Sequence, residues 1–234
     1  PGSQHLSLLP QPYATFGDLA QAEAQQAYAR GDYALARDRY AQLSAGGREY
    51  RPYRDLAAAY EAWDRLDVGA AAQALSELVR ALEDEPWHPL APHLPHLRRQ
   101  ADALARLAPY VASGDPAVEI ELLQQPGLVA MLVFSLRRAA ERRQRAGRFD
   151  LAVVLQYRML ELLVQQRLAA RGVDTVRPDY SALGVPELPA ALFGRQMRLL
   201  RRTPDTALPM HVGLGNGMLL LDIVGDPLVQ GVNW

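Results

Sequence analysis

Apolar residues recur at helical spacing along most of the chain. Between Leu128 and Arg171 they return every three or four positions, and Gly147 is the single glycine of that stretch. No segment alternates apolar and polar residues over the length of a strand. Because such spacing places apolar side chains on one face of a helix, the pattern predicts an all-α fold. The expected helices cover residues 18–30, 32–43, 51–66, 68–84, 93–111, 117–124, 128–146, 149–171, 190–202 and 212–224.

Glycine and proline clusters divide these helices into two groups. The sequence Ser-Gly-Asp-Pro at 113–116 is typical of a loop. We therefore expect a subdomain of helical hairpins over residues 17–115 and a second helical subdomain over residues 116–234. Residues 1–16 are expected to form an extended leader that is broken by proline, and residues 1–3 look like the remnant of an expression vector.

A short pattern, G-x-aromatic-x-x-A, occurs at expected turns between helices. Glycine would end the first helix, the aromatic side chain would wedge into the turn, and the small alanine would let the two helices approach closely. The turn resembles that of tetratricopeptide repeats, but the spacing of the copies does not support a regular array. The copies are GDYALA at 31–36, GRFDLA at 147–152 and the altered form LDVGAA at 66–71. They predict a bundle of antiparallel hairpins that is partly tetratricopeptide-like (TPR-like).

The composition excludes several classes of chemistry. The chain has no cysteine, and all 25 of its basic residues are arginine. Disulfide scaffolds, cysteine zinc sites, thiol catalysis and lysine-containing phosphate loops are therefore excluded. No apolar run reaches the ~20 residues needed to span a membrane, and the leader lacks the basic start and apolar centre of a signal peptide. We expect a cytoplasmic protein that has no membrane partner, metal or cofactor.

The arginines are concentrated in the second half. The first 117 residues carry 15 acidic and 11 basic residues, and the last 117 carry 11 and 14. Guanidinium groups bind phosphate through two parallel hydrogen bonds, so an arginine cluster is a candidate phosphate-binding surface. A solvated helix face is the alternative. The first cluster comprises Arg137, Arg138, Arg142, Arg143, Arg145 and Arg148, and the second comprises Arg195, Arg198, Arg201 and Arg202.

Three further features have ordinary structural explanations. His88, His93 and His96 lie in the segment PWHPLAPHLPHL, which is more typical of a packed linker than of a zinc site. The sequence GLGNG at 213–217 is half of a dinucleotide-binding motif, but no strand is expected before it. An apolar face on the helix at 149–171 belongs either to the core or to a dimer interface. Its residues are Leu151, Val154, Leu155, Met159, Leu162 and Leu163.

Four stretches, in order, resemble the Cas02710 family of CRISPR-associated proteins. They cover residues 10–43, 57–75, 142–175 and 211–228. The third is the most specific: it contains GRFD at 147–150, the pattern YR-x-x-E at 157–161 and GVDT at 172–175. The fourth ends in GDPL at 225–228. The residues that match the core of the family motif are Gly147, Phe149, Asp150, Tyr157, Arg158 and Glu161.

The resemblance implies a fold and an activity. Such proteins combine a CARF domain, which senses cyclic oligoadenylate, with a helical HEPN ribonuclease domain that needs no metal and works as a homodimer. Residues 116–234 would be HEPN-like. The resemblance makes single-stranded RNA the expected partner of Arg137, Arg138, Arg142, Arg145 and Arg148, and it suggests that Arg158 and Glu161 are HEPN-core residues or support the site.

The sequence departs from the family in two respects. No CARF-like pattern of alternating strands and helices occurs, and neither does the catalytic pattern R-x-x-x-x-H. In the family that pattern follows the GDPL block, so we expect a portion of a longer protein, truncated at its C-terminus, or a degenerate homologue. No residue of this chain is assigned as catalytic, whether it is an enzyme stays open, and we expect the chain alone to be inactive. The alternative function is a TPR-like adaptor that binds a protein partner and has no role with RNA.

Overall fold

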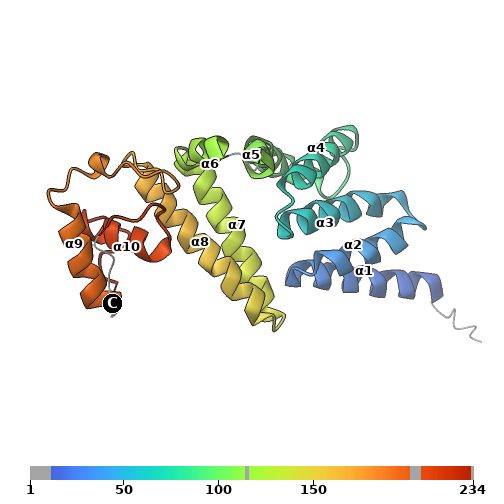
Figure 1. Cartoon of the computed structure of the whole chain (residues 1–234). Helices are drawn as coiled ribbons and strands as arrows, with labels where there is room; N and C mark the ends of the chain where they lie inside the picture. Colours follow the sequence, from blue (N-terminus) through green and yellow to red (C-terminus); the bar gives the residue numbers. More distant parts are fainter. Residues whose placement is uncertain (1–11, 114–115, 201–206, 233–234) are drawn as a thin grey trace, which may run out of the picture. The chain divides into compact units, whose positions relative to one another are not determined.

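The computed structural model describes residues 12–113, 116–200 and 207–232. All regular elements in these ranges are helical (Figure 1), which confirms the predicted all-α class. The longer helices are α1 (Pro12–Arg30), α2 (Tyr33–Ser44), α3 (Arg51–Asp64), α4 (Val68–Asp84), α5 (Leu94–Ser113), α6 (Pro116–Leu123), α7 (Pro126–Arg145), α8 (Phe149–Ala169), α9 (Leu188–Arg195) and α10 (Leu214–Ile223). The short elements are η1 (Arg48–Tyr50), η2 (Ala91–His93), η3 (Tyr180–Leu183) and the π-helical turn η4 (Gln196–Leu200).

The chain divides into two compact units, unit 1 up to Ala112 and unit 2 from Ser113 onward. In unit 1, α1 packs on α2, α2 on α3 and α3 on α4 as successive hairpins. The buried residues of α4 fall at the spacing that one helix face requires. These residues are Val68, Ala71, Ala72, Leu75, Leu78, Val79 and Leu82. The helical period that is visible in the sequence is thus the direct cause of this packing.

The three predicted turns share one backbone conformation. Gly31 and Gly147 have φ values of 81° and 72°, and Leu66 takes the same left-handed conformation with φ 61°. The alanine of each pattern is buried, as expected for closely approaching helices: Ala36 and Ala71 are 0% exposed, and Ala152 is 3% exposed. A left-handed leucine costs about 1–2 kcal/mol that glycine avoids. The altered pattern LDVGAA therefore forms the same turn, with Leu66 in a conformation that is unfavourable for a leucine.

One part of the turn prediction is wrong. In unit 1 the ring of Tyr33 packs against Tyr28 and Tyr60, with centroids 5.4 and 5.5 Å away. Phe149, the matching residue of unit 2, is instead 62% exposed. The reason is that α3 lies against α2 and covers its start. In unit 2, α7 is the hairpin partner of α8, and α10, which also packs on α8, contacts the C-terminal half of that helix.

The core of unit 2 surrounds the C-terminal half of α8. Val164 and Leu168 pack there with three consecutive leucines of α10, at 219–221, and with Leu188 and Leu192 of α9. Gly217 allows this approach, because a Cβ atom built on it would lie 2.4 Å from Cγ1 of Val164. The sequence GLGNG therefore begins a helix that packs tightly against α8 through Gly217.

The expectation for the leader also needs a correction. Residues 12–16 belong to α1 and are not extended, while residues 1–11 lie outside the described part of the chain. Pro12 is the first residue of the helix, where a missing N–H removes no hydrogen bond, so proline can start a helix as well as end one. Similarly, α7 begins at Pro126, two residues before the start of the helix that was predicted at 128–146.

Candidate nucleic-acid interface

The first arginine cluster lies on the hairpin of α7 and α8 (Figure 1), in the last turns of α7 and in the turn that follows. Cations in this position are favoured by the negative end of the helix dipole. That effect accounts for part of the cluster without a ligand. The fold brings the predicted arginines together on one hairpin, but they differ in whether they have an ion-pair partner there.

Glu141 neutralises part of the cluster. Nε of Arg137 lies 3.1 Å from Oε1 of Glu141, and Nη1 of Arg138 lies 3.0 Å from Oε2. Hydrogen bonds from Arg138 and then Arg137 lower the pKa of Glu141, so the carboxylate stays charged at neutral pH. Two of the predicted RNA-binding arginines therefore already have an anionic partner within the hairpin.

Among the described residues, Arg145 and Arg148 differ from the other arginines of the cluster because they combine exposure with the lack of a partner. Both are exposed, and within the described ranges neither has an ion pair or a side-chain hydrogen bond. Arg142 and Arg143 are half-buried and have interactions of their own. Arg145 and Arg148 flank Gly147, so the tight turn holds the two charges at one end of the hairpin.

The second arginine cluster is only partly described. Nε of Arg195 pairs with Asp222 of α10 at 3.0 Å, and Nε of Arg198 donates to the carbonyl oxygen of Gly194 at 3.3 Å. Arg201 and Arg202 lie outside the described residues. The arginines that can be placed thus stabilise unit 2 itself.

The N-terminal half of α8 exposes an apolar face beside the arginines. Phe149, Val153, Tyr157 and Leu160 are all exposed, and Phe134 of α7 is 62% exposed. A hollow of about 630 Å³ lies between the two helices and is lined by residues that include Phe134, Met159 and Leu160. Contiguous apolar surface of this kind is typical of a protein–protein interface. The apolar residues of α8 that the sequence analysis singled out form a different set. Val154 is exposed, and Leu151, Leu155, Met159, Leu162 and Leu163 are half-buried. This second set is therefore not fully enclosed in the core of unit 2.

The residues of the family motif lie largely on the surface. Gly147 forms the turn, and Asp150 is exposed in the first turn of α8, where its charge suits the helix dipole. Arg158 forms an ion pair with Glu161, three residues along, and its side chain is 62% exposed. The Glu161 side chain is half-buried, and the role of the two residues in the HEPN core or in support of the site stays a prediction.

The strongest buried charge of unit 2 is Asp226, which the sequence interpretation missed. It is 0% exposed, and its carboxylate accepts hydrogen bonds from Arg167 at 2.9 and 3.1 Å and from Arg171 at 3.0 Å. Its Oδ1 also accepts from the N–H of Leu228 at 3.0 Å. Burial alone would raise the pKa of Asp226, but these hydrogen bonds outweigh it and lower the pKa. Two arginines four residues apart, Arg167 near the end of α8 and Arg171 in the turn after it, were the signal available in the sequence.

The histidines that the structure describes lie in different surroundings. His88 is buried, accepts a hydrogen bond at Nδ1 from the N–H of Leu90 (3.1 Å) and lies 2.9 Å, through Nε2, from the carbonyl oxygen of Glu49. His93 and His96 are exposed, and Nδ1 of His211 lies 2.8 Å from the carbonyl oxygen of Val176. In the ranges that the structure describes, no three acidic or histidine side chains are grouped so that they could hold a metal ion. The same ranges contain no helix with the length and apolar character to cross a membrane.

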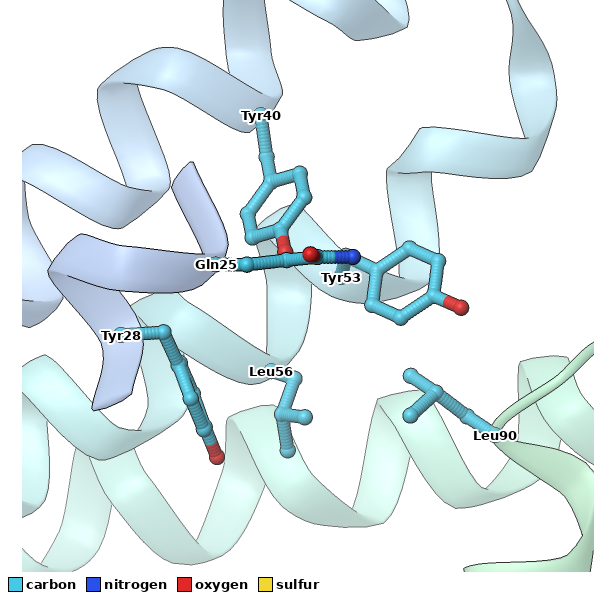
Figure 2. Close-up of a pocket in the computed structure, with 6 residues that line it drawn as sticks. All are labelled: Gln25, Tyr28, Tyr40, Tyr53, Leu56 and Leu90. Carbon is cyan, nitrogen blue, oxygen red and sulfur yellow. The ribbon is translucent and has the colours of Figure 1, made fainter. Parts of the chain in front are cut away.

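Unit 1 contains an aromatic pocket that the sequence did not reveal. It is a cavity of about 230 Å³, lined by Gln25, Tyr28, Tyr40, Tyr53, Leu56 and Leu90 (Figure 2). The rings of Tyr40 and Tyr53 stack with centroids 5.3 Å apart, and Tyr53 contacts His88 at 5.0 Å. These residues come from α1, α2, α3 and the loop after α4, so only the fold brings them together.

Comparison with known proteins gives two adjoining family matches. Residues 16–104 match the model of the Csm6 6H domain, and residues 123–232 match the model of the Csm6 HEPN domain, in the family Cas_Cas02710. The CRISPR system endoribonuclease Csm6 of Thermus thermophilus is 29% identical over 230 residues, which make up 96% of this chain and 47% of that protein. The chain thus spans about half the length of the curated relative it matches. These matches confirm the resemblance that the sequence motifs indicated.

Proposed function

We propose that this chain, which belongs to the Cas02710 family of CRISPR-associated proteins, is the helical effector portion of a ribonuclease that degrades RNA in antiviral defence. The single observation that carries the proposal is the match of residues 123–232 to the Csm6 HEPN domain. Residues 17–115 form the preceding hairpin subdomain and residues 116–234 the HEPN-like one. In the intact protein, a CARF domain would supply the response to cyclic oligoadenylate.

The end of the α7–α8 hairpin is the surface we assign to RNA. Arg145 and Arg148 are exposed, have no ion pair within the described ranges and are held together by the Gly147 turn. Arg142 lies one turn before Arg145, while Arg137 and Arg138 share Glu141. Paired arginines contribute less to phosphate binding, because a phosphate would have to compete with the carboxylate. We therefore rank Arg145 and Arg148 above Arg137 and Arg138.

The binding of single-stranded RNA to the chain tests this assignment. We expect measurable affinity that falls about tenfold or more in the double variant Arg145→Gln/Arg148→Gln, because each lost phosphate contact removes favourable counterion release. The matched pair Arg137→Gln/Arg138→Gln should weaken binding less. RNA cleavage is not expected, because the chain contains no R-x-x-x-x-H pattern. Fluorescence anisotropy with a labelled RNA measures the affinities, and equal losses in both variants would contradict the ranking.

We also assign the apolar face of α8 to a second copy of the chain, as the homodimer hypothesis requires. Phe149, Val153, Tyr157 and Leu160 offer the apolar contact, and the hollow beside Phe134 offers a place for a side chain of the partner. Sedimentation analysis should show a concentration-dependent dimer that Val153→Glu weakens strongly. Leu19→Glu, at an exposed leucine of unit 1, is the control and should leave the dimer intact.

A protein adaptor is the second candidate function, and the hairpins of unit 1 favour it. The unit 1 turns at Gly31 and Leu66 have the left-handed residue and the buried alanine of a TPR-like turn, and the Gly147 turn of unit 2 shares both features. If the chain bound no RNA at any salt concentration but retained a partner protein, this function would replace the one proposed above.

A further inference from the structure

The aromatic pocket of unit 1 has the chemistry of a site for a flat ring. Figure 2 shows Gln25, Tyr40 and Tyr53 next to one another along one side of the pocket, with Tyr28, Leu56 and Leu90 bordering the other side. None of the lining residues is charged. A cavity of about 230 Å³ is below the usual range for drug-sized ligands, so it suits a single ring system.

Three polar groups of the pocket have no protein partner. In the described part of the chain, the amide of Gln25 and the hydroxyls of Tyr40 and Tyr53 make no side-chain hydrogen bond. Tyr28, in contrast, hydrogen-bonds to Tyr60, which in turn donates to Gln100 at 2.8 Å. Aromatic walls with a few convergent polar groups are the usual composition of a small-molecule site.

The remaining wall is held in place by His88. This buried histidine accepts a hydrogen bond from the N–H of Leu90, and its ring packs on Tyr53. Its Nε2 lies against the carbonyl oxygen of Glu49, which fixes the loop after α4 to η1. Leu90 is thus positioned by the same residue that supports Tyr53, so the pocket is a formed feature of the unit.

We propose that this pocket binds an unstacked nucleobase, with adenine as the best match. Tyrosine faces stack on any base, and a glutamine amide can pair with the donor and acceptor that adenine presents side by side. Because no charged residue lines the pocket, the phosphate of the nucleotide would remain outside. The base belongs either to a free nucleotide or to an RNA strand. The site is separate from the arginines of unit 2 and does not depend on their function.

Titration of the 234-residue chain with adenosine monophosphate and with an eight-nucleotide adenine RNA tests the proposal. We expect saturable binding that weakens about tenfold in Gln25→Ala, because the paired amide is lost, and in Leu90→Trp, because the new side chain fills the cavity and displaces the stacked base. One such base contact is worth about that factor. Gln26→Ala is the matched control, since Gln26 is exposed on α1 and does not line the pocket. Gln25→Ala removes an exposed side chain and should leave the fold unchanged.

The two probes separate the sources of the base and separate this proposal from the preceding one. If the monophosphate binds, the pocket is a site for a free nucleotide. If only the RNA binds, and Leu90→Trp weakens that binding, the pocket holds a base of an RNA strand. If neither probe binds, or if Gln25→Ala and Leu90→Trp bind as tightly as the parent, the pocket proposal is overturned. If Gln25→Ala and Leu90→Trp bind RNA as tightly as the parent, a loss of RNA binding in Arg145→Gln/Arg148→Gln would still support the arginine proposal. Conversely, binding of the monophosphate would still support the pocket proposal if the arginine variants bound RNA normally.

Discussion

The turns at Gly31 and Gly147 share one sequence pattern and one backbone conformation, yet their surroundings differ. After Gly31, the aromatic ring is enclosed by tyrosines from α1 and α3. After Gly147, the ring of Phe149 is exposed, together with a row of apolar residues on α8. The turn is therefore determined locally, by a left-handed residue and a small alanine. Whether the aromatic residue is buried depends on a third helix, and among the described residues of unit 2 no third helix covers that end.

The turn after Gly31 is therefore covered by its own unit, whereas the turn after Gly147 leaves an apolar face exposed. Unit 2 obtains its stability at the opposite end of α8, where Val164, Leu168 and the Asp226 ion pairs lie. The open half of the hairpin is consequently free to carry binding residues. Changes at the closed end should destabilise the protein, and changes at the open end should alter association instead.

The largest effect is expected at Asp226. Asp226→Asn removes a buried charge that two arginines share, and breaking such a group should lower the free energy of unfolding of unit 2 by about 3 kcal/mol. Denaturant unfolding followed by circular dichroism measures the change. Glu187→Gln, an exposed carboxylate of the same unit, is the control and should change stability little.

The pH dependence gives a second readout of the same site. The pKa of Asp226 is lowered in the folded protein, so its contribution is present at neutral pH and is lost as the pH falls below about 4, the ordinary value for aspartate. The stability difference between the parent chain and Asp226→Asn should therefore shrink at acidic pH. A difference that is constant with pH would show that the carboxylate charge is not what stabilises this end of α8.

The next largest effect is expected at Gly217. A Cβ atom there would meet Cγ1 of Val164, a β-branched side chain that rotates little in a helix. Gly217→Ala should cost about 2 kcal/mol by overpacking. Val164→Ala in the same chain should recover part of that loss, because it removes the opposing methyl groups. If Gly217→Ala were neutral, α10 would not approach α8 as closely as the structure indicates.

The two aromatic residues allow the comparison of the turns to be tested directly. Tyr33→Ala should destabilise unit 1 by about 1.5 kcal/mol, because the ring has two aromatic neighbours and is half-buried. Phe149→Ala should leave the stability of the monomer nearly unchanged and weaken self-association. Unfolding of dilute protein and sedimentation at higher concentration measure the two effects. A large loss of monomer stability in Phe149→Ala would mean that this ring is covered within its own chain.

The smallest effect, and the one with opposite sign, is expected at Leu66. Leu66→Gly relieves a left-handed conformation and should stabilise unit 1 by up to about 1 kcal/mol, less the lost contacts of the side chain. Gly147→Ala is the reciprocal change and should destabilise unit 2 by a similar amount. Thermal unfolding of both variants is sufficient, and shifts in the same direction would contradict a shared turn geometry.

Local features of the fold could be predicted from the sequence, and features that depend on contacts between distant residues could not. The helices and the turn alanines followed from periodicity and from small residues beside glycine. Charge density alone could not separate Arg145 and Arg148 from Arg137 and Arg138, because the separation depends on where Glu141 points. The Asp226 ion pairs and the tyrosine pocket join residues that are far apart in the sequence. The spacing of Arg167 and Arg171 was the local trace of the first, but it does not identify Asp226 as their partner, and the second leaves no local pattern.

The salt dependence of RNA binding tests most directly whether the open end of unit 2 faces nucleic acid. For single strands, each phosphate contact adds about 0.7 to the slope of the logarithm of affinity against the logarithm of salt concentration, so Arg145→Gln/Arg148→Gln should lower the slope by about 1.4. Arg80→Gln/Arg106→Gln, at exposed arginines of unit 1, is the matched control and should leave the slope unchanged. Equal slopes for the parent chain and both double variants would contradict the assignment of the hairpin end to RNA.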